Sequence, residues 1–279
     1  MVEPLVFAAV LAAAAMHAGW NALAKRGLEP ARAVTLIAIA TSLAALPLLP
    51  WVALPRGELW LWIVGSAVLH TAYKLALIEA YSAGELGQVY PIARGTAPLI
   101  VALVGVLWLG ETLAPELFAG VLVLSFGVIL MALKGSGPRP EPAAIGYALA
   151  TACAIAAYTL VDGHGARRAP SAASFALYLF VIDGAMIAAV FLARWGPREM
   201  IGLARHWRHG LIGGTLSLGA YWVAIWAMTQ APIAAVAALR ETSVLFALLL
   251  SRVLLGERLG LGRLGAALMI LAGAVLVRA

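Results

Sequence analysis

Long apolar runs separated by short polar gaps fill the whole chain. There are ten such runs, and each has 19 to 24 residues. A helix of that length crosses roughly 30 Å of hydrocarbon at about 1.5 Å per residue. The runs cover residues 4–24, 33–55, 59–81, 86–109, 113–133, 143–161, 172–193, 210–231, 232–251 and 259–277. Unbroken stretches such as AAVLAAAA do not fit alternating barrel strands, so the pattern predicts an all-α integral membrane protein with ten transmembrane helices.

Composition leads to the same class of protein. The 279 residues are 63% hydrophobic and 11% charged, whereas a soluble domain is roughly half apolar and about a quarter charged. The net charge of +6 would suggest nucleic acid in a soluble protein, but here the basic residues lie mostly between apolar runs. They indicate topology and concentrate on the side opposite the termini, which places both termini outside. We therefore expect a multi-pass protein of the cell membrane, with the lipid bilayer as partner and no nucleic acid.

Few chemical sites are available outside the spans. Cys153 is the one cysteine, which excludes disulfide frameworks and cysteine redox pairs, and we expect no metal and no cofactor. The longest polar connections, 134–142 and 194–209, leave no room for a soluble catalytic domain. The function is therefore expected between the helices.

The chain repeats itself. Shifting it by 146 residues aligns 93–111 with 239–257, with seven of nineteen positions identical. The shared residues include an arginine inside the span (Arg94 and Arg240) and a Gly-Glu pair at its end (110–111 and 256–257). Two neighbouring offsets extend the match: 146 also pairs the glycines at 127 and 273, and 148 pairs Ala-Tyr at 72–73 with Ala-Tyr at 220–221.

The repeat predicts two halves, 1–134 and 143–279, joined by a linker at 135–142. Because each half has five helices, an odd number, the second half enters the membrane upside down relative to the first. Such inverted repeats are typical of secondary transporters, whose substrate site lies near the midplane between the halves.

The repeated pattern also resembles a known family. A Pro- and Leu-rich fourth helix ends in LGE and is followed by a Gly-rich fifth helix at 97–133, and LGE followed by a Gly-rich helix occurs again at 254–276. This pattern is similar to the EamA-type family of the drug/metabolite transporter superfamily. The resemblance implies ten transmembrane helices, two EamA repeats, and export or exchange of small metabolites such as amino acids without ATP hydrolysis.

Polar residues inside the spans are the candidate site, because ionisable groups are costly there. On the first and third predicted helices they recur at spacings of three and four residues, which place them on one face. Aromatic walls with a few convergent polar groups suit a small-molecule site. The candidates for one central substrate cavity are His17, Trp20, Asn21, His70, Tyr73, Lys74, Tyr90, Arg94, Tyr158, Tyr221, Trp222 and Arg240.

The sign of the charges inside the spans narrows the class of substrate. Lys74, Arg94 and Arg240 are cations inside spans, and arginine binds a carboxylate through two parallel hydrogen bonds. The leading hypothesis is an anionic or zwitterionic metabolite, such as an amino acid or another carboxylate-bearing solute. The alternative is internal neutralisation by three carboxylates, at positions 79, 183 and 241.

Related exporters of cationic drugs use a glutamate in their first helix. The first helix here has none in its span, which counts against a cationic-drug efflux transporter. Asp183 and His17 are the candidates for carrying a coupling proton, with facilitated diffusion as the alternative.

Other classes of membrane protein stay open. A membrane enzyme would carry a recognisable constellation such as HExxH or GxSxG, and neither occurs here. A receptor or scaffold would more often append a soluble domain. We therefore expect a transporter and not an enzyme, and leave open whether it assembles as a homo-oligomer.

Overall fold

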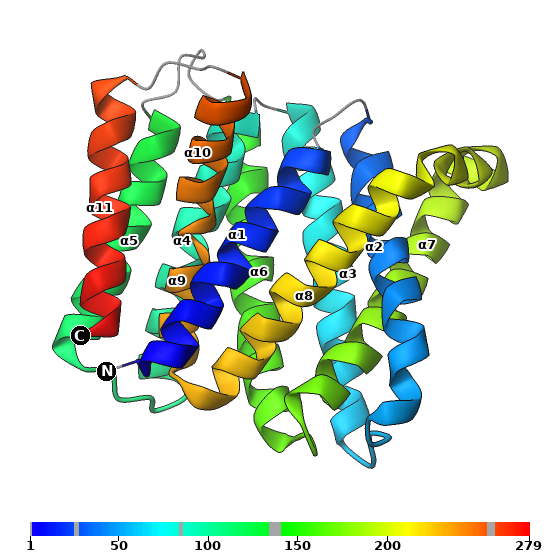
Figure 1. Ribbon diagram of the computed structural model, residues 1–279, viewed down its shortest axis with the longest axis horizontal. Coiled ribbons are helices and arrows are strands. Elements are labelled where there is room, and N and C mark those ends of the chain that lie inside the picture. The colour runs from blue at the N-terminus through cyan, green and yellow to red at the C-terminus, as the bar shows by residue number, and fades with distance from the viewer. Residues whose placement is uncertain (1, 25–27, 84–85, 134–140, 256–259) are drawn as a thin grey trace.

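The computed structural model describes residues 2–24, 28–83, 86–133, 141–255 and 260–279, and within these ranges every regular element is a helix (Figure 1). The elements are α1 (Pro4–Ala24), α2 (Pro30–Ala45), η1 (Leu46–Trp51), α3 (Leu59–Ala83), α4 (Leu86–Leu107), α5 (Pro115–Leu133), α6 (Pro142–Arg168), α7 (Ala172–Leu203), η2 (Ala204–His206), α8 (Trp207–Gln230), α9 (Ile233–Arg240), α10 (Ser243–Leu255) and α11 (Leu261–Arg278).

Eight helical stretches in the described ranges are long and apolar enough to cross a membrane. One of them, Ala172–Gln230, has 59 residues and holds both α7 and α8. The apolar part of α5, Pro115–Met131, is shorter than such a span. The protein is all-helical and membrane-embedded, as predicted, while the number of ten crossings stays a prediction. The predicted linker lies mostly outside the described residues, as does the Gly-Glu pair at 256–257.

Two predicted helix ends are wrong in an instructive way. The second predicted span, 33–55, leaves the α-helix after Ala45, because Pro47 and Pro50 lack the amide hydrogens that the helical ladder needs. The segment continues as the 3₁₀ helix η1. At the other extreme, α6 continues to Arg168, beyond the predicted end at 161, so that Asp162 is helical and buried.

The predicted polar connection at 194–209 is mostly helical. Gly196, with a φ of 83°, kinks α7, and the chain then continues in helical form through η2 into α8. Glycine tolerates this left-handed backbone at no steric cost. The apolar pattern did not predict the helical structure of this segment because many of its residues are polar.

The ninth predicted span, 232–251, is broken in the middle. It divides into α9 and α10, with Glu241 and Thr242 between them. The amides of these two residues donate to carbonyls three residues earlier, to Ala238 at 2.9 Å and Leu239 at 3.1 Å. The break is therefore a tight turn.

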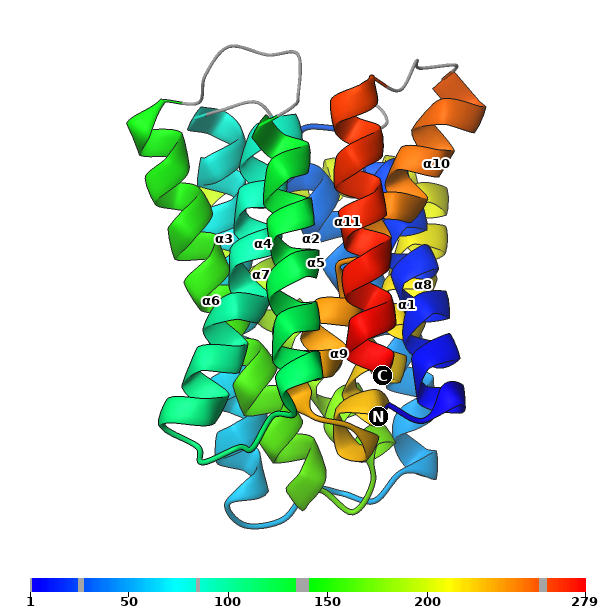
Figure 2. The ribbon, with the colours of Figure 1, turned by 90° about the vertical axis from the view of Figure 1, so that its left-hand side faces the viewer.

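The two halves of the chain interleave in the bundle. Figures 1 and 2 show both termini at one end, with α1 running away from that end and α6 running back toward it. Helix α3 packs against α6, and α8 packs correspondingly against α1. Helices α2 and α7 pack against each other, as do α5 and α11.

The α5–α11 contact depends on small residues. A Cβ atom on Gly120 would lie 2.6 Å from the backbone nitrogen of Val277, and one on Gly273 would lie 2.5 Å from that of Leu124. The two backbones therefore touch, which is a common way for membrane helices to associate.

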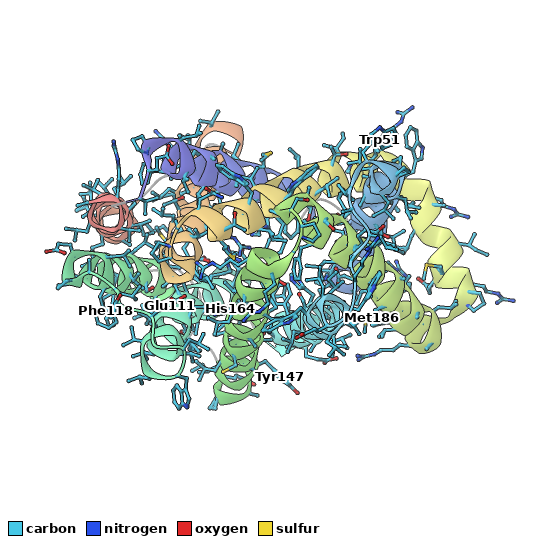
Figure 3. The ribbon with its side chains drawn as sticks, turned by 90° about the horizontal axis from the view of Figure 1, so that it is seen from below. Trp51, Glu111, Phe118, Tyr147, His164 and Met186 are labelled. Carbon is cyan, nitrogen blue, oxygen red and sulfur yellow. The ribbon has the colours of Figure 1, made fainter. Side chains whose placement is uncertain are left out.

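The perimeter of the bundle is apolar. Leu61 is 76% exposed and Leu261 is 88% exposed. Viewed from the end of the bundle where the termini lie, Trp51 and Tyr147 also project from the outer edge (Figure 3). Side chains of this kind suit contact with lipid.

Arg167, near the C-terminal end of α6, connects several segments at the end of the bundle where the termini lie. Its guanidinium donates to the carbonyls of Met228 and Ala231, both at 2.9 Å, and lies 3.6 Å from the carboxylate of Glu111. These contacts join α6 to the α8–α9 connection and to the segment before α5. Glu111 is labelled in Figure 3.

Candidate functional site

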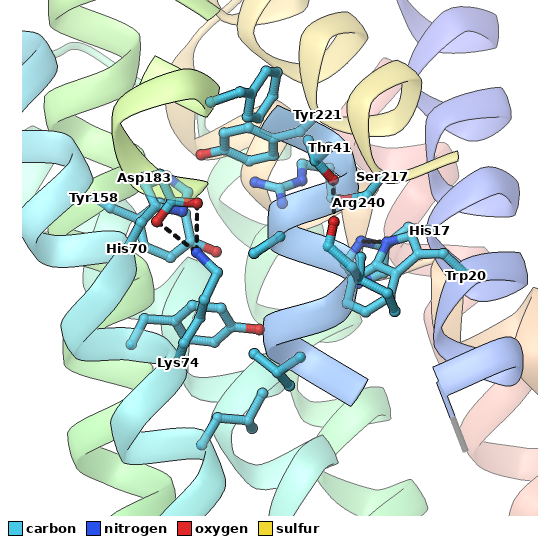
Figure 4. Close-up of a pocket in the computed structure, with 16 residues that line it drawn as sticks. His17, Trp20, Thr41, His70, Lys74, Tyr158, Asp183, Ser217, Tyr221 and Arg240 are labelled. Carbon is cyan, nitrogen blue, oxygen red and sulfur yellow. Dashed lines mark hydrogen bonds and ion pairs between the residues drawn. The ribbon is translucent and has the colours of Figure 1, made fainter. Parts of the chain in front are cut away.

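A cavity of about 90 Å³ lies inside the bundle. It extends from the middle toward the end opposite the termini, since Val34 lies near the start of α2 and Leu77 lies late in α3. Its wall consists of His17, Trp20, Val34, Ile37, Ala38, Thr41, His70, Tyr73, Lys74, Leu77, Tyr158, Phe180, Asp183, Ser217, Tyr221 and Arg240 (Figure 4). Helices from both repeats contribute to it. Space of this size holds several water molecules or the polar end of a small solute.

Stacked aromatic rings form one side of the cavity. The ring of His70 stacks on Tyr158 with a centroid distance of 4.0 Å and meets Tyr221 edge-on at 5.2 Å. Tyr73 meets Tyr158 at 5.5 Å. These contacts fix the rings and leave an apolar surface with polar tips.

A buried carboxylate holds this aromatic wall in place. Asp162 is fully buried and accepts hydrogen bonds from the hydroxyls of Ser66 and Tyr221. The Nε2 atom of His70 lies 3.0 Å from the same carboxylate. Three groups from two helices thus converge on Asp162, so its carboxyl oxygens have hydrogen-bond partners although the residue is fully buried.

An ion pair crosses the cavity wall between α3 and α7. The ammonium of Lys74 donates to both oxygens of Asp183, at 2.7 and 2.6 Å (Figure 4). The side chains are 12% and 9% exposed, toward the cavity that both of them line.

A second pair lies deeper. The Nε of Arg94 donates to the carboxylate of Glu241 at 2.8 Å, and the two side chains are 2% and 3% exposed. The bond joins α4 of the first repeat to the turn between α9 and α10 of the second. The Nη2 atom of Arg94 is buried without a hydrogen-bond partner.

Arg240 is the cation that faces the cavity without a carboxylate. Its guanidinium lies over the ring of Tyr221 at 4.7 Å, a cation–π contact. In the described part of the chain, no carboxylate lies within 4.0 Å of it. A positive group therefore remains available to a ligand.

His17 has both ring nitrogens engaged. The indole of Trp20 donates to Nδ1 at 3.3 Å, and Nε2 lies 3.2 Å from the hydroxyl of Tyr90. A neutral imidazole with an accepting Nδ1 carries its hydrogen on Nε2, so His17 donates to Tyr90. The side chain of Asn21 donates to the backbone carbonyl of His17 at 2.9 Å.

Within the described residues, the predicted internal neutralisation is present for Lys74 and Arg94 and absent for Arg240. Asp183 and Glu241 pair with Lys74 and Arg94, as above. Glu79, near the C-terminal end of α3, pairs instead with Arg194 of α7, at 2.8 Å.

The structure places eight of the twelve predicted site residues on the cavity wall. They are His17, Trp20, His70, Tyr73, Lys74, Tyr158, Tyr221 and Arg240, and the coupling candidate Asp183 lies there too. The other four lie behind the wall or in the packing between helices: Asn21, Tyr90, Arg94 and Trp222.

Sequence reasoning missed part of the wall. Thr41 and Ser217 add hydroxyls, and Phe180 adds a ring. Helix α2 has no ionisable residue among its wall positions, so the search for charges inside spans had no signal there. The apolar residues of α2 predicted a helix, but they did not show which face of it lines the cavity.

Metal ligands do not gather in the described part of the chain. No group of three His, Cys, Asp or Glu side chains there is arranged to hold a metal ion, and Cys153 is free and exposed. The chemistry available in the cavity is hydrogen bonding, charge pairing and aromatic contact.

Comparisons with known proteins agree with this architecture. A solved structure described as "Crystal structure of protein" is similar over 98% of this chain and 96% of that chain, with a TM-score of 0.72 and 17% sequence identity. At that identity the likeness concerns the fold alone. No curated protein matches the chain.

The model of the EamA-like transporter family matches the chain twice, over residues 5–133 and 142–279. These two stretches carry the repeated motifs that suggested the family, and together they cover nearly all of the sequence. The family consists of membrane transporters of small solutes and not of enzymes. The chain belongs to the EamA-like transporter family.

Proposed function

We propose that this protein is a secondary transporter that moves small carboxylate-bearing metabolites, anionic or zwitterionic, across the cell membrane. The observation that carries the proposal is Arg240, a guanidinium on the cavity wall with no carboxylate within 4.0 Å in the described chain. Arginine suits a carboxylate because its planar fork donates two parallel hydrogen bonds. The positive charge of Arg240 would repel a cationic solute.

The apolar part of such a solute has matching surface. The rings of Tyr73, Tyr158 and Phe180 line the same cavity as Arg240. A site with aromatic walls and one fixed charge orients a small molecule by its charged end.

We propose alternating access as the way the solute crosses. The opposite directions of α1 and α6, and the reciprocal packing of α3 on α6 and α8 on α1, support an inverted repeat. In transporters built this way, one repeat rocks against the other around a central site. The cluster of contacts around Arg167 supports closure at the end with the termini.

Asp183 is the proposed carrier of a coupling proton. It lines the cavity next to its partner Lys74, so protonation of the carboxylate would release that cation toward the solute. His17 is the second candidate, although both of its ring nitrogens already have partners.

Transport in reconstituted vesicles tests the function. We would measure counterflow of two carboxylates, L-leucine and 3-phenylpropionate, beside their amides, L-leucinamide and 3-phenylpropanamide. The expected result is movement of a carboxylate and exclusion of its amide. Arg240→Gln is expected to abolish this movement, while Arg198→Gln, which changes an exposed arginine, leaves it intact.

Two outcomes would contradict the proposal. Equal movement of acids and amides would show that no carboxylate site exists, and normal transport by Arg240→Gln would show that Arg240 does not form it. In the same vesicles, Asp183→Asn is expected to remove stimulation by a pH gradient. Unchanged stimulation would exclude Asp183 as the proton carrier.

A further inference from the structure

Glu241 lies between two arginines. Its carboxylate accepts a hydrogen bond from Arg94, and it directly follows Arg240 in the chain. The charges of both arginines act on this carboxylate. Within the described residues, Arg94 has a carboxylate within 4.0 Å and Arg240 has none. Of two guanidinium groups at matching positions in the repeats, one thus has a bonded carboxylate among the described residues and the other has none.

The bond between Arg94 and Glu241 is an incomplete one. It uses the single Nε hydrogen, and the buried Nη2 of Arg94 has no partner. Arginine–carboxylate pairs frequently form two parallel hydrogen bonds, whereas this pair forms one. A buried arginine with one bond and one unpaired nitrogen is suited to exchanging its partner.

This pair lies directly behind the cavity wall. The guanidinium of Arg94 lies 5.8 Å from the ring of Tyr90, whose hydroxyl contacts the wall residue His17 at 3.2 Å. Glu241 lies in the turn between α9 and α10, where the α-helical ladder is interrupted. A rotation of this turn would redirect the carboxylate without unwinding a helix.

We propose that Glu241 is a built-in competitor for the anion site of the cavity, and that Arg94 holds it away from Arg240. The inference rests on the proposed function, in which Arg240 binds the carboxylate of the solute. While a solute occupies Arg240, Glu241 stays on Arg94, and each arginine has one counter-ion. When the protein closes around an unloaded cavity, Glu241 turns toward Arg240 and its charge is shared by the two.

The reason for such a device is the cost of a buried charge. Closing a cavity around an unpaired guanidinium removes water from it, at a penalty of several kcal/mol. A movable carboxylate compensates that charge when no solute does. Arg94 is then a positioning residue, because it acts on the solute only through Glu241.

Binding measurements on three variants test this role. The purified full-length protein in detergent would be titrated by calorimetry with L-leucine, 3-phenylpropionate and their two amides. Arg94→Gln is expected to weaken carboxylate binding about tenfold or more, because the released Glu241 then occupies Arg240. Any binding of the amides is expected to stay unchanged.

The double variant Arg94→Gln/Glu241→Gln is expected to regain the affinity lost in Arg94→Gln and to bind the carboxylates as tightly as Glu241→Gln does, because it removes the competitor along with its holder. Glu241→Gln alone is expected to bind the carboxylates more tightly than the wild type. If either single variant does not fold, the double variant decides the question, because it leaves neither member of the pair unpaired and is expected to bind the carboxylates more tightly than the wild type. A purely structural pair would give neither the restored affinity nor the tighter binding.

Three results would overturn the inference: unchanged carboxylate affinity in Arg94→Gln, no restoration in the double variant, or no gain in Glu241→Gln. Arg240→Gln in the same titration separates this failure from failure of the proposed function. If Arg240→Gln binds carboxylates normally, the proposed function is wrong. If it loses binding while Arg94→Gln does not, only the role of Glu241 is wrong.

Discussion

Arg94 and Arg240 occupy matching positions in the two repeats, yet their surroundings differ. Arg94 is 1% exposed and bonded to Glu241 behind the cavity wall. Arg240 lies on the wall itself, over the ring of Tyr221. The residue that follows each arginine also differs, since Gly95 stands where the second repeat has Glu241.

Packing explains this difference. A Cβ atom on Gly95 would lie 2.7 Å from the side chain of Ile129 and 2.9 Å from the backbone oxygen of Ser125. Helix α4 therefore contacts the backbone of α5 at this position, and no side chain fits. The second repeat opens its helix at the corresponding place and gains room for a carboxylate. One repeat thus supplies a tightly packed helix, and the other supplies a turn that carries charge.

Breaking the two buried ion pairs is expected to give the largest effects on stability. Glu241→Gln leaves Arg94 buried without a partner, and removing one member of a buried pair costs about 3–5 kcal/mol. Asp183→Asn is expected to cost less, about 1–3 kcal/mol, because Lys74 faces the cavity and can be hydrated there.

Unfolding in detergent micelles would measure both free energies. The double variant Arg94→Gln/Glu241→Gln is the control, and it is expected to recover part of the loss because neither member of this pair is left as a buried, unpaired charge. Equal losses in Glu241→Gln and Asp183→Asn would contradict the distinction between a deep pair and a cavity pair.

Filling the close contact beside Arg94 is expected to give the next effect. Gly95→Ala forces α4 away from α5 and is expected to lower the free energy of unfolding by about 1–3 kcal/mol. Gly65→Ala is the matched control, since a Cβ atom there meets nothing within 4 Å. It is expected to leave stability unchanged or raise it by up to about 1 kcal/mol. Equal behaviour of the two variants would show that α4 has room to move at Gly95.

The sequence predicted most of the helices because a bilayer demands long apolar runs, whatever the tertiary packing. It also predicted much of the cavity, because groups such as Lys74 and Asp183 are costly in hydrocarbon and stand out among apolar neighbours. The repeat further marked Arg94 and Arg240 as a related pair.

The rest depends on packing that periodicity does not encode. Trp222 directly follows the wall residue Tyr221, yet it packs against the hydrophobic core, and Tyr90 lies on α4, which adds no residue to the described wall. The hydroxyls of Thr41 and Ser217 line the cavity, although such residues are common on any membrane helix. The close contact of Gly95 with α5 also decides that Arg94 lies behind the cavity wall while Arg240 lies on it. This contact between two helices cannot be predicted from the sequence pattern.

The smallest effect is expected from the tyrosines that the repeat pairs with each other, Tyr73 and Tyr221. The ring of Tyr221 makes a cation–π contact with Arg240, and its hydroxyl donates a hydrogen bond to Asp162. Tyr221→Phe keeps the ring but leaves the carboxylate with one donor fewer. It is expected to weaken carboxylate binding by about 1 kcal/mol, or roughly fivefold. Tyr73 meets Tyr158 through its ring, and its hydroxyl has no hydrogen bond to the described residues, so Tyr73→Phe is expected to change affinity by less than that. Calorimetry with L-leucine and 3-phenylpropionate would compare the two variants. Equal losses would mean that the hydroxyl bonded to Asp162 has no special part in presenting Arg240, and that the two repeats contribute their tyrosines alike.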